Sequence, residues 1–133
     1  MKPQDAKRYL AQYRESMERA GEIVSNLSEL KREAEALRDH EGQRVQLDAA
    51  VAKYVDACKE SEDELDRLAE IRTQIMTLID KVGDTKQHSV LWRRYISGMT
   101  WEQVAVSMSY TYRRITQLHG AALRTICEIM PKT

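Results

Sequence analysis

The strongest constraint in this sequence is the spacing of its apolar and small residues, which recur every three or four positions in two long series. The series are Ala6, Leu10, Tyr13, Met17, Ala20, Ile23, Leu27, Leu30, Ala34 and Leu37, and then Leu47, Val51, Tyr54, Cys58, Leu65, Leu68, Ile71, Ile75, Leu78 and Val82. Such spacing lines up side chains along one side of an α-helix. With only five Gly, two Pro and no Phe in 133 residues, little interrupts these helices. The sequence predicts an all-α fold.

The two series predict two long amphipathic helices with a break near Gly42 and an end at Gly83, where a C-cap glycine is common. Each apolar stripe needs a partner, because an isolated helix of this kind is marginal in water. The helices can form an antiparallel hairpin within one chain, or a coiled coil with a second copy that gives a homodimer. Both arrangements are open at this point.

The charges divide the chain into an acidic front and a basic back. Residues 1–85 hold 14 basic and 19 acidic residues, a net charge of −5, whereas residues 86–133 hold seven basic and two acidic residues, a net charge of +5. This asymmetry suggests that the back alone meets a polyanion such as double-stranded DNA. The alternative is that surface charge has segregated without a functional reason.

The sequence changes character after residue 83, so we expect two parts, 1–83 for oligomerisation or partner binding and 84–133 for binding DNA. In the second part, Asp84 or Thr85 can cap a helix that Gly98 ends. Thr100 can cap the next helix, and Gln103 three residues later completes a capping box.

This short helix over 101–108, a turn at 109–111 and a final helix over about 112–126 have the proportions of a DNA-binding helix-turn-helix. Small Ala105 suits the crossing of the two helices, where we expect Val104 and Met108 to face Ile115 and Leu118 and Tyr110 to fill the turn. The residues expected to face outward and read bases are Thr111, Tyr112, Arg113, Thr116 and Gln117. Those expected to contact phosphates are Lys86, Arg93, Arg94, Arg114 and Arg124. The alternative is an ordinary helical hairpin with a polar outer side.

The stretch TWEQVAVSMSYTYRRITQLHGAALRTI resembles region four of bacterial sigma factors, the module that binds the −35 promoter element. The matching residues are Glu102, Val104, Thr111, Arg114, Ile115, Gln117, Ala122, Leu123 and Arg124. Together with YLAQYRESMERAGEIVSNLSELKREA at the front, it resembles small phage transcription regulators of the RinA and ArpU group. The resemblance implies a coiled-coil-like front before a sigma-like helix-turn-helix, and control of late phage genes in the bacterial cytoplasm.

Three positions of the helix-turn-helix depart from the sigma pattern. Ser109 stands where glycine is usual, and a left-handed backbone there costs on the order of 1 kcal/mol without glycine. Tyr112 and Thr116 replace residues that are often basic. A −35-like target sequence therefore does not carry over to this chain.

Two other DNA- or polymerase-related roles fit the pattern less well. A small terminase subunit also joins a helix-turn-helix to oligomerising helices, but commonly places the DNA-binding motif first. A protein-only adaptor would use the motif to contact RNA polymerase. An enzyme is not expected, because acidic runs such as Glu62, Asp63 and Glu64 have no nucleophile, phosphate loop or histidine beside them.

No cofactor, metal site or membrane segment is expected. The three histidines are scattered, and Cys58 and Cys127 stand at apolar helical positions without a CxxC motif, which suits reduced thiols. The longest apolar runs are only a few residues, and the first residues lack the apolar core of a secretory signal.

Overall fold

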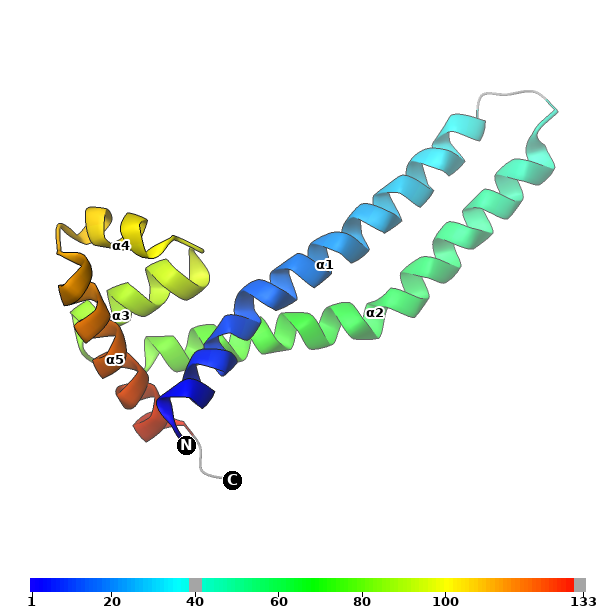
Figure 1. The fold of residues 1–133 in the computed structure, drawn as a ribbon. Helices are drawn as coiled ribbons and strands as arrows, with labels where there is room; N and C mark the ends of the chain where they lie inside the picture. Colours follow the sequence, from blue (N-terminus) through cyan, green and yellow to red (C-terminus); the bar gives the residue numbers. More distant parts are fainter. Residues whose placement is uncertain (39–41, 131–133) are drawn as a thin grey trace. The chain divides into compact units, whose positions relative to one another are not determined.

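A computed structural model describes residues 1–38 and 42–130 and confirms the all-α fold (Figure 1). The described residues contain helices and no strand. The elements are α1 (Pro3–Leu37), α2 (Arg44–Asp80), α3 (Thr85–Leu91), the π-helix η1 (Trp92–Ile96), α4 (Trp101–Met108) and α5 (Tyr112–Ile129). No helix among these residues has an apolar stretch long enough to cross a membrane.

The chain packs as two compact units, and α1 and α2 run through both. The head unit consists of residues 1–16 and of the chain from residue 71 onward, and the hairpin unit consists of residues 17–70. The division at residue 83 stays a prediction about function, since the packing groups both ends of the chain together. Residues 131–133 of the predicted second part lie outside the described residues.

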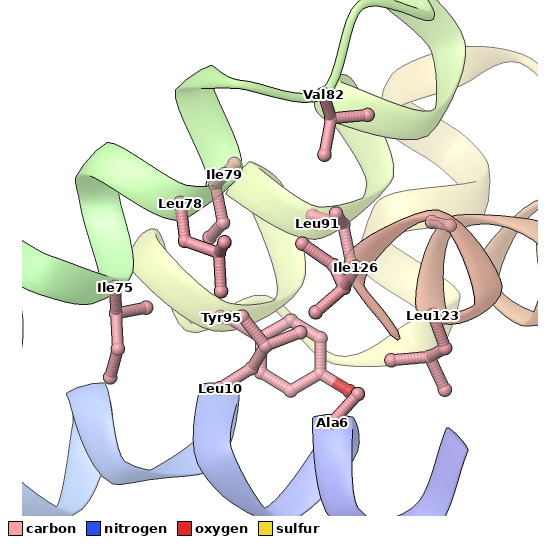
Figure 2. Packing of buried hydrophobic residues seen from close by; sticks show 11 residues of the cluster. Ala6, Leu10, Ile75, Leu78, Ile79, Val82, Leu91, Tyr95, Leu123 and Ile126 are labelled. Atoms are coloured by element: carbon pink, nitrogen blue, oxygen red, sulfur yellow. The ribbon is translucent and has the colours of Figure 1, made fainter. Parts of the chain in front are cut away.

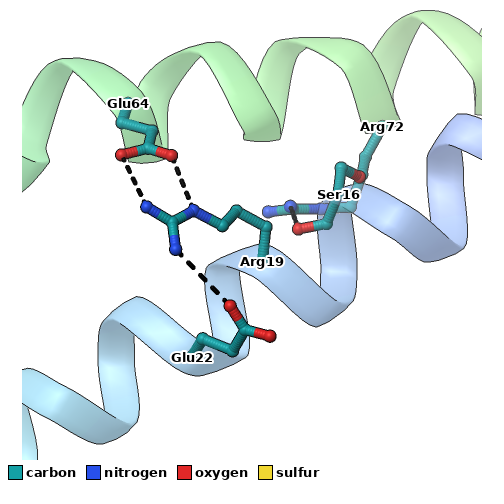
Figure 3. Close-up of polar contacts among 5 residues, drawn as sticks. All are labelled: Ser16, Arg19, Glu22, Glu64 and Arg72. Carbon is teal, nitrogen blue, oxygen red and sulfur yellow. Dashed lines mark hydrogen bonds and ion pairs between the residues drawn. The ribbon is translucent and has the colours of Figure 1, made fainter.

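In the hairpin unit α1 and α2 lie side by side and antiparallel (Figure 1). The two helices therefore form a hairpin within one chain. Gly42, in the connection, has a φ of +80°, which confirms the predicted break. The Arg19 guanidinium joins the helices by donating to Glu64, with Nε and Oε1 2.8 Å apart, and it also contacts Glu22 (Figure 3). The guanidinium holds the pKa of the Glu64 carboxyl below its usual value.

The largest core of the head unit joins the beginning of α1 and the end of α2 to the C-terminal helices (Figure 2). We call it the first core. Leu10 from α1, Ile75 from α2 and Ile126 from α5 have no exposed surface. Its buried residues are Ala6, Leu10, Ile75, Leu78, Ile79, Val82, Leu91, Tyr95, Ala122, Leu123 and Ile126. The DNA-binding helices predicted for the back of the chain are therefore anchored on the front.

Two arginines reinforce this anchoring by donating to main-chain oxygens within the head unit. Arg14 of α1 donates to the oxygen of Ile96, which ends η1, at 3.3 Å. The same guanidinium covers Gly98, where a Cβ would lie 2.7 Å from its carbon. Arg72 of α2 donates to the oxygen of Ser16 at 3.4 Å (Figure 3). Gly98 has a φ of +73°, so it ends the preceding helix as the sequence predicts.

Three local predictions need correction. α2 ends at Asp80, so Gly83 is not its C-cap. Val82, which lies between Asp80 and Gly83, is buried in the first core. The helix predicted from residue 85 to 97 passes into a π-helix at Trp92. Of the apolar series, Met17 and Val51 keep 44% and 43% of their surface exposed, because two helices alone cover only one side of each stripe.

A second core of the head unit holds α4 against α5, and Val90 of α3 completes it. Its other buried members are Val104, Ala105, Ile115 and Leu118, with Met108 and Tyr110 packed against them. This contact confirms the packing that the sequence predicts for a helix-turn-helix. Ala105 is 9% exposed at the crossing, where a larger side chain would separate the helices.

Two valines of α4 provide a matched test of this second core. Val104 has no exposed surface, whereas Val106 is 79% exposed. We expect Val104→Ala to lower the free energy of unfolding by about 1.5–3 kcal/mol, because the lost methyl groups are buried. Val106→Ala should change it by less than about 0.5 kcal/mol. Urea denaturation of both variants measures the difference, and equal losses would place α4 elsewhere.

Candidate nucleic-acid interface

The turn between α4 and α5 has the geometry of a helix-turn-helix. At the start of α4, Thr100 and Gln103 form the predicted capping box, with N···O distances of 2.9 and 3.2 Å. At its end, Ser109 is left-handed, with φ 58° and ψ 40°. The amide of Tyr110 then donates to the oxygen of Ala105 at 3.0 Å. Ser109 thus adopts the left-handed conformation that glycine usually supplies at this position of the turn.

The two threonines predicted to read bases also stabilise α5. Thr111 is the N-cap of α5, and its hydroxyl oxygen accepts from the amide of Arg114 at 3.1 Å. The hydroxyl of Thr116 donates to the oxygen of Tyr112 at 3.0 Å. Since a hydroxyl has one donor and two acceptor sites, each threonine keeps part of its capacity for another partner. Both are exposed.

The remaining predicted base-reading residues, Tyr112, Arg113 and Gln117, are exposed on α5. Arg124, which is predicted to contact a phosphate, follows Gln117 by seven residues and lies on the same side of the helix as Arg113 and Gln117. Tyr112 is 59% exposed at the first position of α5. The buried apolar residues of α5 all enter one of the two cores; they are Ile115, Leu118, Ala122, Leu123 and Ile126. We call Arg113 and Gln117 the reading face.

The side chains predicted to contact phosphates fall into two groups, those exposed to solvent and those half-buried in the protein. Lys86, Arg114 and Arg124 are exposed, and the Lys86 ammonium lies 5.8 Å from the ring centre of Tyr110. Arg94 is engaged, because it donates to the oxygen of Met99 at 2.9 Å and stacks on the Trp101 ring at 4.5 Å. Arg93, like Arg94, is half-buried.

His119, which belongs to no sequence motif, lies between the two cores. The His119 ring lies edge-on to Trp101, with centroids 4.5 Å apart, and its Nε2 is 2.7 Å from the hydroxyl of Tyr95. Burial lowers the pKa of His119 to about 4, with Lys7 and Arg94 acting in the same direction. Burial raises the pKa of Tyr95 to about 12. At neutral pH the His119 ring is therefore neutral, and its Nε2 can accept a hydrogen bond from the Tyr95 hydroxyl.

The described part of the chain contains no group of three His, Cys, Asp or Glu side chains arranged to hold a metal ion. Cys58 and Cys127 are free thiols and half-buried. No family model, curated protein or solved structure matches the chain. Its function must therefore be argued from the geometry of the head unit.

The buried His119 predicts a specific loss of stability in mild acid. The unfolded chain binds a proton near the ordinary histidine pKa of 6.5, but the folded protein does so only near 4. Unfolding therefore takes up a proton in this window, and stability falls as pH decreases through it. We expect a loss on the order of 2 kcal/mol between pH 7 and pH 4 from this group.

Denaturation at a series of pH values, for the wild type and for His119→Asn, measures this contribution. The variant is less stable at pH 7 but has a flatter pH dependence, since its side chain does not titrate. Identical slopes for the two proteins, or a His119 resonance that titrates near 6.5, would contradict the buried neutral ring.

Proposed function

We propose that this protein is a sequence-specific DNA-binding transcription regulator that inserts α5 into the major groove. The observation that carries the proposal is the division of α5 into two sides. Its apolar side enters the two cores, and its other side exposes Arg113, Gln117 and Arg124 next to a capped helix start.

The chemistry of the reading face suits base edges. Arginine can bond the O6 and N7 acceptors of guanine, and glutamine can bond both groups of an adenine edge. Arg113 and Gln117 are one helical turn apart, so both side chains fit one groove. The exposed Lys86 and Arg114 supply charge for phosphates beside it.

The cellular role that we propose follows from the resemblance to phage regulators of the RinA and ArpU group. In this role the protein controls late genes of a phage or prophage in the bacterial cytoplasm. Host RNA polymerase is a partner consistent with a sigma-like head. The protein-only adaptor remains the alternative if the reading face proves not to bind DNA.

Gln117 provides the sharpest test of base recognition. Gln117→Ala should weaken binding to a site selected from randomised DNA by about 1–3 kcal/mol and relax the preference at one base pair. The matched control is Gln12→Ala, which removes an exposed glutamine from α1 of the same unit. Recovery of the same motif with unchanged affinity by Gln117→Ala would favour the adaptor.

Salt dependence tests the electrostatic part of the proposal. If Lys86, Arg113, Arg114 and Arg124 each neutralise one phosphate, the logarithm of affinity falls with that of salt at a slope of about −3 to −4 per head unit. Arg124→Ala should flatten this slope by about one. Arg94→Ala should instead lower the melting temperature, because Arg94 is engaged within the protein. A flat salt dependence would exclude this surface as a DNA contact.

A further inference from the structure

The two sides of the hairpin unit differ in polarity. On one side Asn26 of α1 and Lys53 of α2 line the same shallow groove. The full lining is Asn26, Leu30, Lys53, Asp56, Ala57 and Glu60. The ion pair between Arg19 and Glu64 also belongs to this unit. The groove side thus carries mainly charged and amide groups, as expected of a surface in contact with water.

The opposite side of the hairpin unit is apolar. Residues two positions apart on an α-helix point about 200° apart. Because Asn26 and Lys53 share the polar side, Val24 and Val51 lie on the other one. Spacings of seven extend each of these positions into a line along its helix. The resulting apolar face consists of Met17, Val24, Val51, Cys58 and Leu65.

Part of this apolar face is uncovered within the chain, although Cys58 and Leu65 are half-buried. Met17, Val24 and Val51 are 44%, 52% and 43% exposed, although hydrophobic side chains in such a line gain most from burial. The unit also lacks a deep core of its own. Among its described residues only Ile23 and Ala34 are buried. Two helices with so little buried surface are expected to need a further partner.

We propose that the apolar face is covered by the same face of a second copy of this chain, packed antiparallel to form a four-helix bundle. Two charges in line with the residues of the face favour this occupant. Lys31 continues the line of Met17 and Val24 toward the turn of the hairpin, and Glu62 lies between Cys58 and Leu65. Both Lys31 and Glu62 are exposed.

The register of the hairpin places these two charges at different heights. Arg19 lies beside Glu64, so Glu62 is level with the beginning of the α1 segment, and Lys31 lies about ten residues nearer the turn. In an antiparallel pair whose two-fold axis passes midway between these heights, each Lys31 is level with Glu62 of the other copy. In a parallel pair Lys31 and Glu62 would stay about ten residues apart along the bundle. This proposal does not depend on DNA binding.

Two exposed valines provide a matched test of the apolar face. Val24 lies on the face, whereas Val45, 79% exposed, points about 120° away from Val51 around α2. Sedimentation of the full chain should give twice the mass of one chain for the wild type and for Val45→Arg. Val24→Arg should dissociate at least about tenfold more readily, because it buries an unpaired charge. Circular dichroism should show unchanged helix content in both variants, since neither valine is buried in one chain.

Charge exchange tests the antiparallel arrangement. Lys31→Glu and Glu62→Lys should each weaken the dimer, and the double variant should restore it. A monomeric or higher-order wild type, or equal dimerisation of Val24→Arg and Val45→Arg, would overturn the proposal that a second copy covers the face. Failure of the double variant to recover would overturn the antiparallel pairing.

Discussion

The first core is the constraint on which the rest of the head unit depends. It brings Leu10, near one end of the chain, into the same cluster as Ile126, near the other. Ile75 of α2 completes the contact between them. With these three side chains fully buried, α5 has a fixed rotation about its axis, and its polar side is held outward. A reading face needs this kind of support, because side chains that select bases must be held by rigid elements.

The supporting interactions continue from the first core to the turn of the helix-turn-helix. Tyr95 belongs to the first core and contacts His119, whose ring packs against Trp101 beside the second core. Arg94 stacks on the Trp101 ring and donates to the main-chain oxygen of Met99. A cation that the sequence assigned to phosphate is thus engaged in holding the first helix of the motif. The surface left for DNA is accordingly smaller and centred on α5.

The sequence predicted those features that depend on local chemistry. The capping box at Thr100, the cap at Asp84 and the turn at Ser109 follow from residues a few positions apart, and all three are confirmed. The apolar spacing likewise predicted the helices and the residues that hold α4 against α5. Such features can be inferred because neighbouring side chains decide them.

Features that depend on distant residues could not be predicted in this way. The π-helix at Trp92–Ile96 and the contact of His119 with Tyr95 arise only when separate helices are packed together. His119 did carry one signal, since it stands four residues after Ile115 on the buried side of α5. The exposure of Met17 likewise depends on which side of α1 its neighbour covers.

The most direct test of the account is chemical-shift mapping of the full chain with a mixed-sequence DNA duplex at low salt. Non-specific binding uses the same electrostatic surface as specific binding, so no known target is required. The account predicts that amide and side-chain signals shift most at residues 111–117 and at Arg124. Shifts confined to residues 17–70, or no shift at any duplex concentration, would contradict the claim that α5 is the DNA-binding element.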